Sequence, residues 1–304
     1  MSGEKTDSGS PVSWDEALLL QHLADSLSTS LAMGGMNLHP KRVRRQLEAN
    51  DNCRPLLEKW AGLSADQRLE AYQQLLHFAP DACQEPLAGC VRCGQCCRRA
   101  SPALHEQDLP LVRAEKIPLR HLVTYRRGER LRAMIGDDVE ILRQERIKLK
   151  EKDSSGECVF FDPGSELCTI YPHRPWECRA QACWDPALAL ELQKRPYLTR
   201  ADVIPELPTL QQLLDEHDRR CQPQALEEAF SRLLEGADEQ AARQAVEVVA
   251  FDDHFRHFVA ERFGLERETL DFFFGRSFAA QVGRFGFQIV TRADDTRVLE
   301  PRAG

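Results

Sequence analysis

Eight of the eleven cysteines fall in two dense groups, and they are the residues of this chain best suited to chemistry. The first group is Cys90, Cys93, Cys96 and Cys97, and the second is Cys158, Cys168, Cys178 and Cys183. Thiolates select zinc, copper(I) or iron–sulfur clusters, and a C-x-x-C spacing lets two sulfurs reach one metal with little backbone strain. The two groups therefore predict an iron–sulfur cluster, zinc, or both.

The first group repeats the C-x-x-C spacing twice, like the ligand run of a 4Fe-4S cluster, but it lacks the C-x₃-C-P ending of that run. Adjacent side chains point apart, so Cys96 and Cys97 should serve different sites, or one of them is a bystander. Eight thiolates divide into two four-ligand sites, or into one cluster and one structural zinc. His173 could replace a cysteine, although a surface or hydrogen-bonded histidine is the more ordinary interpretation.

The turn sequence Asp162-Pro163-Gly164 separates two short apolar stretches and predicts a β-hairpin. A three-residue loop with the glycine in the left-handed position would pair Phe161 with Ser165. In that register Cys158 lies opposite Cys168, and both thiols leave the same face of the hairpin.

A short helix is predicted to follow the hairpin, with Pro175 at its first position. Cys178 would lie in this helix. Cys183, five residues later, would be about 140° further around the axis if the helix continued. The two cysteines should therefore face different neighbours, or the helix ends between them.

The remaining sequence predicts a mostly helical α+β protein with a small cysteine-rich centre. Helical patterns cover residues 14–31, 64–78 and short pieces of 104–123. The second of these begins with a capping box at Ser64 and is expected to stop at Pro80. Further helices are predicted from residue 209, over 224–234 and over 238–263. Residues 141–150 fit a strand or a helix, with the alternation at 148–150 favouring an exposed strand. The expected organisation is a disordered tail (1–15), a helical module (16–86), a metal-binding domain (87–200) and a C-terminal helical region (201–304).

Composition narrows the class of protein. The net charge is −8 and the pI is near 5.7, which argues against a general nucleic-acid binder. The sequence contains no run of eighteen apolar residues, so it predicts no membrane span. Residues 1–15 lack the apolar core of a secretory signal. We therefore expect a soluble, cytoplasmic protein, and in that reducing compartment clustered cysteines bind metal more often than they form disulfides.

One segment departs from the acidic average. Residues 113–152 carry twelve Lys/Arg against seven Asp/Glu, a net charge of +5. A solvated face is the ordinary interpretation, and a docking surface for an unknown protein partner, through Arg126 and Arg127 among others, is the alternative.

Two further sets of residues need an interpretation. Cys53, Cys83 and Cys221 lie outside the two groups and are predicted to be buried small apolar residues. Asp252, Asp253, His254 and His257 are candidates for an enzyme site, although this pattern on a helix more often forms a solvated or capping face. The long apolar stretches around Phe272–Phe274 and Phe285–Phe287 predict packed core.

The cysteine spacing also carries a family resemblance. C-x-x-C-G-x-C-C at 90–97, C-V-F-F at 158–161, C-T-I-Y at 168–171 and R-P-x-x-C-R at 174–179 resemble the bacterial YkgJ-type cysteine-cluster family. That family is described as a zinc- or iron-chelating CxxCxxCC domain and as iron–sulfur-cluster-containing proteins. The resemblance covers about residues 89–184 and implies metal chelation. A related branch, the flagellin lysine methylases, couples such a motif to methyl transfer, but no glycine-rich loop follows a clear strand here.

Three functions compete on this evidence. The leading one is metal or cluster binding, with electron transfer or redox sensing. The second is a cluster-containing, protein-modifying enzyme of the methylase kind. The third is a zinc-stabilised interaction module that docks through residues 113–152.

Overall fold

The computed structural model describes residues 9–30, 38–87, 89–132, 139–152, 155–182, 187–204, 208–236, 238–292 and 297–302. The chain forms two compact units. Unit 1 comprises residues 1–98, 160–169 and 179–194, and unit 2 comprises 99–159, 170–178 and 195–304. Segment 87–200 thus contributes to both units, and each unit is described by itself below.

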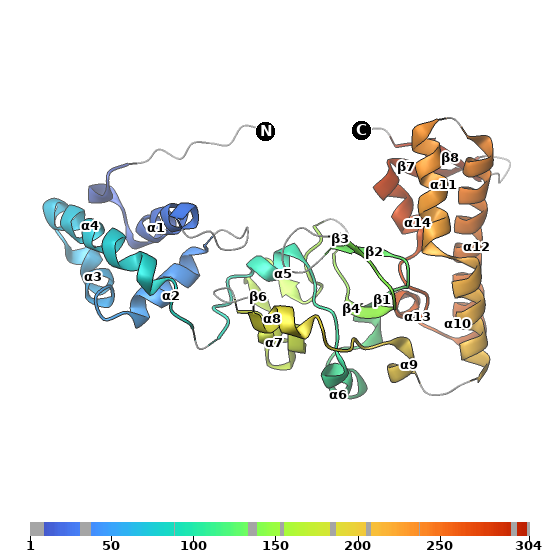
Figure 1. Ribbon diagram of the computed structural model, residues 1–304, viewed down its shortest axis with the longest axis horizontal. Helices are drawn as coiled ribbons and strands as arrows, with labels where there is room; N and C mark the ends of the chain where they lie inside the picture. Colours follow the sequence, from blue (N-terminus) through green and yellow to red (C-terminus); the bar gives the residue numbers. More distant parts are fainter. Residues whose placement is uncertain are drawn as a thin grey trace. The chain divides into compact units, whose positions relative to one another are not determined.

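Unit 1 begins with helices that share one core (Figure 1). They are η1 (Pro11–Ser13), α1 (Glu16–Ser30), α2 (Pro40–Ala49), α3 (Arg54–Lys59), η2 (Trp60–Gly62) and α4 (Ala65–Ala82). Leu19, Leu23, Leu47, Trp60 and Leu75 are among the fully buried side chains of this core. In α1, Leu19 and Leu20 take inward positions, whereas Leu18 is exposed.

Helix α4 confirms one prediction and corrects another. The Ser64 hydroxyl accepts from the Gln67 N–H, and the Gln67 side chain accepts from the Ser64 N–H, which is the predicted capping box. The helix does not stop at Pro80 but runs to Ala82. Ala79 and Ala82 are buried in the core, and this packing keeps the last turn helical in spite of the proline.

The rest of unit 1 is small. It consists of α5 (Gln95–Arg99), the hairpin strands β5 (Phe161–Asp162) and β6 (Leu167–Cys168), and α8 (Ala187–Leu192). The hairpin confirms the predicted pair of strands around residues 162–164.

Unit 2 starts with short elements around two small sheets. They are η3 (Glu106–Asp108), α6 (Leu109–Arg113), η4 (Leu119–His121), β1 (Leu122–Tyr125), β2 (Arg130–Arg132), β3 (Val139–Ile141), β4 (Arg146–Leu149), η5 (Tyr171–His173), α7 (Trp176–Ala180) and α9 (Arg200–Val203). Strand β1 pairs antiparallel with β4, and β2 with β3.

Strand β4 settles the ambiguity at residues 141–150 in favour of a strand. The expectation of an exposed strand is wrong, since Ile147, Lys148 and Leu149 are all buried. The Lys148 ammonium lies 3.4 Å from a Glu151 carboxylate oxygen and 5.3 Å from the centre of the Tyr125 ring. These partners allow a charged side chain to be buried.

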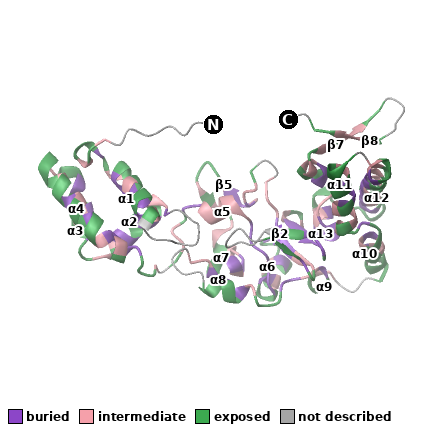
Figure 2. Ribbon diagram, turned by 45° about the horizontal axis from the view of Figure 1, so that its top comes forward, coloured by how far each residue is buried: buried purple, intermediate pink, exposed green. Residues whose placement is uncertain are grey.

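The C-terminal part of unit 2 is helical, with one hairpin (Figure 2). It contains α10 (Pro208–Arg220), α11 (Pro223–Glu235), α12 (Glu239–Phe263), η6 (Arg267–Thr269), α13 (Leu270–Phe274), α14 (Phe278–Gln281), η7 (Val282–Phe285), β7 (Phe287–Thr291) and β8 (Arg297–Pro301). Gly264 ends α12 in the left-handed conformation, and Phe272–Phe274 are buried as predicted. The β7–β8 hairpin was not predicted.

The mostly helical α+β class is confirmed. Four two-stranded antiparallel sheets accompany the helices in the described part of the chain. Within the same residues, no helix combines the length and the apolar character that crossing a membrane requires.

Candidate metal centre

The first cysteine group forms a tight turn that leads into α5. Arg92 and Gly94 have positive φ angles of 56° and 77°, so the backbone curls back on itself between the cysteines. The Arg92 N–H consequently donates to the Cys90 sulfur at 3.3 Å. Backbone N–H groups directed at sulfur stabilise its thiolate form, which is the form that binds metal.

Cys93 lies at the centre of this turn and is buried. Burial raises the pKa of its thiol, the Gln95 N–H opposes that effect, and the neighbouring Cys90 and Cys97 raise the pKa further. Cys90 and Cys97 therefore both lie near Cys93. Their mutual repulsion as thiolates is what a bound cation would relieve.

Gly94 allows the hairpin to pack against the turn. A Cβ atom at this position would lie 2.8 Å from the Phe161 ring and 3.1 Å from the Arg98 guanidinium. Phe161 is buried, and the Arg98 guanidinium covers its ring at 4.7 Å. The glycine is thus required both by the backbone angle and by the close approach of strand β5.

The hairpin register differs from the predicted one. Phe161 pairs with Cys168 and Asp162 with Leu167, so Cys158 does not pair with Cys168. The Asp162 carboxylate accepts from the N–H groups of Gly164 and Ser165, which widens the loop, and Glu166 takes the left-handed conformation expected of the glycine. This side-chain turn competes with the shorter backbone turn and determines the register.

The observed register has a consequence for Cys168. Side chains of paired residues leave the same face of a hairpin. Because the Phe161 ring contacts Gly94, the Cys168 side chain lies on the face of the hairpin that meets the cysteine turn. Glu166 accepts from Lys41 at 2.7 Å and from Arg98 at 2.9 Å, and these hydrogen bonds lower its pKa to about 2.

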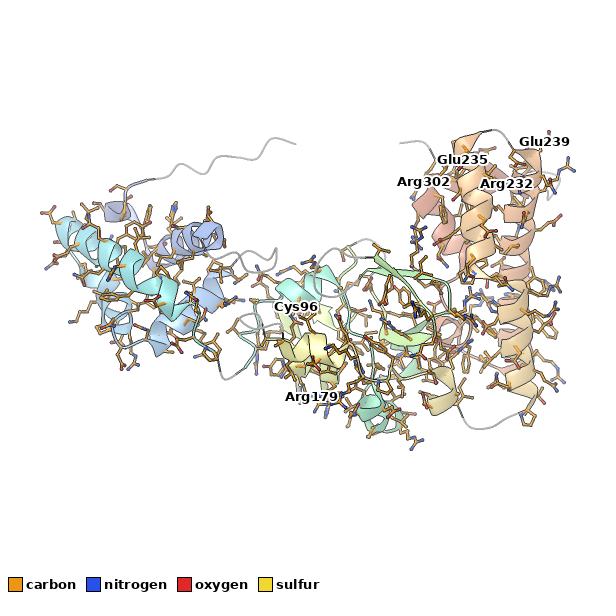
Figure 3. The ribbon with its side chains drawn as sticks, in the orientation of Figure 1. Cys96, Arg179, Arg232, Glu235, Glu239 and Arg302 are labelled. Atoms are coloured by element: carbon orange, nitrogen blue, oxygen red, sulfur yellow. The ribbon has the colours of Figure 1, made fainter. Side chains whose placement is uncertain are left out.

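The remaining described cysteine of the first group, Cys96, lies with Cys97 on α5 and is half-buried (Figure 3). Consecutive residues of a helix point about 100° apart. Cys96 therefore leaves the helix in a different direction from Cys97.

Unit 2 contributes Cys158 and Cys178. Cys158 is buried and forms an isolated β-bridge with Glu151, whose carboxylate accepts from the Ser101 N–H at 3.0 Å. Cys178 lies in α7, as predicted, although the helix begins at Trp176 rather than at Pro175.

Buried carboxylates hold the first turn of α7. The Trp176 N–H donates to Asp108 at 2.8 Å, and Glu177 accepts from the Ala103 N–H at 2.7 Å. His173 is half-buried at the end of η5. Cys183 lies outside the described residues, so whether the helix ends before it stays a prediction.

The other three cysteines are buried, which confirms their predicted role. Burial raises the pKa of Cys53 to about 11 and those of Cys83 and Cys221 to about 12. The ten cysteines in the described part of the chain are thiols rather than disulfides.

A second buried cluster of potential ligands was missed in the sequence. His217, Cys221 and Asp252 lie in unit 2 with one ligand atom each within 4.8 Å of the others. The His217 ring donates Nε2–H to Asp252 at 2.7 Å, and the Arg256 guanidinium donates to the same oxygen at 2.8 Å. Arg126 lies 3.3 Å from the other His217 nitrogen. Two guanidinium groups beside the cluster make it a buried ion-pair network and unfit for a metal cation.

This network corrects the interpretation of residues 252–257. Asp252 is fully buried and does not belong to a solvated face, whereas Asp253, His254 and His257 are exposed. Only the helical period of α12, with Asp252 in step with the buried Ala245 and Val249, could have indicated its inward position.

Some basic side chains of segment 113–152 are buried and are therefore not accessible to a partner. Arg126 is only 3% exposed and Lys148 is 5% exposed, so neither can form part of a docking surface. Arg113, Arg120, Arg127 and Arg143 are exposed. A protein partner for this segment stays a prediction.

Comparison with known proteins agrees with the cysteine pattern. Residues 89–203 match the model of the CxxCxxCC family, described as a "Putative zinc- or iron-chelating domain". No curated protein and no solved structure matches the chain. The match includes all eight clustered cysteines and leaves out the N-terminal helices and the C-terminal part of unit 2.

Proposed function

We propose that this chain, whose residues 89–203 form a zinc- or iron-chelating cysteine domain, holds zinc or an iron–sulfur cluster in a four-thiolate centre. The ligands of this centre would be Cys90, Cys93, Cys97 and Cys168. The observation that carries the proposal is the tight turn at 90–97, in which the Arg92 N–H donates to the Cys90 sulfur and Cys93 is buried. The contact of Phe161 with Gly94 supports Cys168 as the fourth ligand.

The donor set suits zinc and iron equally. Four thiolates bind a single zinc or a 4Fe-4S cluster, and either leaves about two negative charges on the centre. Arg98 and the N–H groups directed at sulfur would offset part of that charge. With zinc the centre would be structural. With iron it would add electron transfer or redox sensing, and a cytoplasmic location would keep the thiols reduced.

The other clustered cysteines form the second part of the proposal. Among them, Cys158 and Cys178 both belong to unit 2 and would bind a second metal ion or cluster.

Metal content of the purified protein tests the proposal. Protein prepared without oxygen should contain zinc, or iron with matching acid-labile sulfide and a visible absorption band. Cys90→Ser and Cys168→Ser should each abolish binding of the same metal ion or cluster. Cys158→Ser should abolish binding of a different one. The matched control is Cys53→Ala, a buried cysteine outside both groups, which should keep the full metal content. Loss of different equivalents from Cys90→Ser and Cys168→Ser would reject the shared centre.

A further inference from the structure

Unit 2 contains a pocket that has no cysteine in its wall. Its volume is about 690 Å³, within the range of small-molecule sites. The charged residues that line it are Arg126, Arg127, Arg143, Arg200, Glu145 and Asp218. Four guanidinium groups against two carboxylates leave the wall with a net charge of +2.

The two carboxylates are already engaged. Arg200 donates to Glu145 at 2.6 Å and to Asp218 at 2.5 Å, and its remaining terminal nitrogen donates to the Phe273 carbonyl at 2.7 Å. Arg127 and Arg143 are exposed and make no ion pair with any described residue. Arg126 Nη1 lies 3.7 Å from Asp218 Oδ1, so the excess positive charge of the pocket is carried by Arg127 and Arg143.

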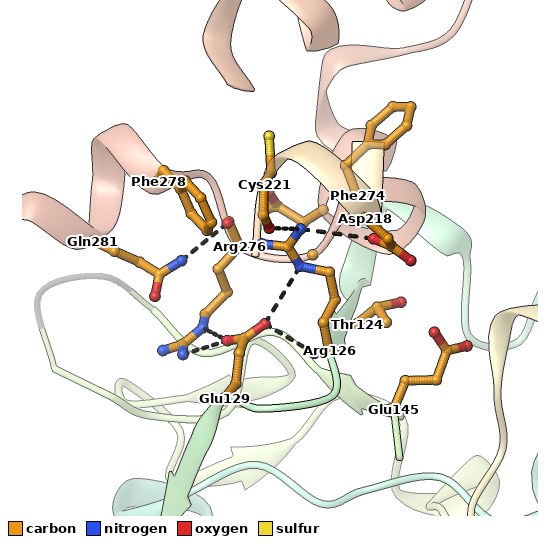
Figure 4. Close-up of polar contacts among 12 residues, drawn as sticks. Thr124, Arg126, Glu129, Glu145, Asp218, Cys221, Phe274, Arg276, Phe278 and Gln281 are labelled. Atoms are coloured by element: carbon orange, nitrogen blue, oxygen red, sulfur yellow. Dashed lines mark hydrogen bonds and ion pairs between the residues drawn. The ribbon is translucent and has the colours of Figure 1, made fainter. Parts of the chain in front are cut away.

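Arg126 is a buried cation with an unused donor (Figure 4). Its Nη1 donates to the Cys221 carbonyl at 2.8 Å and lies 3.3 Å from His217 Nδ1. Its Nη2 is buried but has no hydrogen-bond partner among the described residues. Leaving a buried charged donor unpaired costs free energy, so this nitrogen is suited to an acceptor brought by a ligand.

The neighbours of Arg126 hold its guanidinium in place. Glu129 lies 3.7 Å from Nε, and the Phe278 ring lies 5.0 Å from the guanidinium carbon. Glu129 also pairs with Arg276 at 2.5 Å, so its charge is shared between two arginines. Arg126 therefore keeps a fixed orientation.

The start of helix α11 adds a second feature that favours anions. Gln222 precedes the helix and Pro223 is its first residue, and both line the pocket. The Gln222 side chain makes no capping hydrogen bond. The first N–H groups and the positive end of the helix dipole favour a negative charge at this position.

We propose that this pocket binds the phosphate group of a small phosphate monoester. Such a group carries close to two negative charges at neutral pH, which matches the excess charge of the wall. Arginine forks recognise its tetrahedral oxygens through paired, charge-assisted hydrogen bonds. The ligand would engage the side of Arg126 that lines the pocket, and Arg127 and Arg143 would hold it from the open side.

Calorimetry with inorganic phosphate and with glycerol 3-phosphate tests the proposal on the full chain. The double variant Arg127→Gln/Arg143→Gln removes two exposed charges and should keep the fold. This double variant should bind both probes at least about tenfold more weakly, since each of its two substitutions removes charge-assisted hydrogen bonds to the ligand. The matched control is Arg113→Gln/Arg120→Gln, which removes two exposed arginines of the same segment outside the pocket and should bind like the parent chain.

Three results would overturn the proposal: neither probe binds, both double variants bind equally, or succinate binds as tightly as glycerol 3-phosphate. The last result would assign the pocket to carboxylates. Arg126→Lys gives an independent check, since it keeps the charge but not the fork, and it should weaken phosphate binding in protein whose circular dichroism is unchanged.

Discussion

The cysteine turn of unit 1 and the arginine pocket of unit 2 gather like charges in opposite ways. The turn collects Cys90, Cys93 and Cys97 within eight residues, and its backbone N–H groups support the sulfurs. The pocket collects arginines from position 126 to position 200, and half-buried Glu145 and Asp218 pair with Arg200. In the proposed centre a bound cation would relieve thiolate repulsion in the turn, whereas four of the six charges of the pocket are already paired with each other. The first region should therefore depend on its ligand for order, and the second should not.

Metal removal should give the largest difference between the two regions. Because structural zinc contributes about 10–16 kcal/mol of binding free energy in small sites, chelation or Cys93→Ser should expose the amides of residues 90–99 to hydrogen exchange. The amides of α12 should keep their protection. Exchange measured by mass spectrometry checks this. Equal loss of protection in both regions would contradict the comparison, and Cys53→Ala serves as the control.

Disrupting the His217–Asp252–Arg256 network of unit 2 should lower the stability of the fold even when no ligand is bound. Asp252→Asn removes the buried carboxylate 2.8 Å from Arg256 and leaves that guanidinium with half-buried Asp271 at 3.5 Å, so the free energy of unfolding should fall by about 3–5 kcal/mol. Urea unfolding of the Asn variant gives this value. The matched control is Asp253→Asn, which removes an exposed partner of Arg297 and should cost less than about 1 kcal/mol. Similar losses in both variants would mean that burial of Asp252 matters little.

Acid should weaken the same network. Burial opposes ionisation of Asp252, but the hydrogen bond from His217 and the charge of Arg256 outweigh it and lower the pKa from 3.8 to about 2. A lowered pKa contributes stability that is present above the unfolded value and is lost as the pH falls from about 4 towards 2. The contribution is about 2 kcal/mol. Urea unfolding at several pH values should show this loss in the parent chain and a smaller one in Asp252→Asn.

The smallest expected effect concerns the backbone of the cysteine turn. Gly94→Ala places a side chain at a φ of 77°, which costs roughly 1–2 kcal/mol, and the new methyl group would also push against Phe161. We expect weaker metal retention in a chelator competition and unchanged phosphate binding by unit 2. Gly62→Ala, where nothing lies within 4 Å of the new atom, is the control. Equal metal retention in the two variants would count against the proposed centre.

The hairpin shows the limit of local patterns. The turn residues 162–164 predicted two strands, which the fold confirms, but the register was wrong because the Asp162 side chain builds a wider loop. The same limit applies to Asp252 and Arg126. Both look like surface charges in a sequence, and both are buried because partners distant in the chain satisfy them.

The sequence by itself determined what depends on neighbours within a few residues. These features are the capping box at Ser64, the left-handed end of α12 at Gly264, the mostly helical composition and the metal-binding character of the cysteine spacing. Only the tertiary structure decided which face of the hairpin Cys168 occupies, and only it brought Arg126, Arg143, Arg200 and Asp218 to one pocket. Local hydrogen bonds and helix propensity act along the chain, whereas burial of a charge depends on residues that only folding brings together.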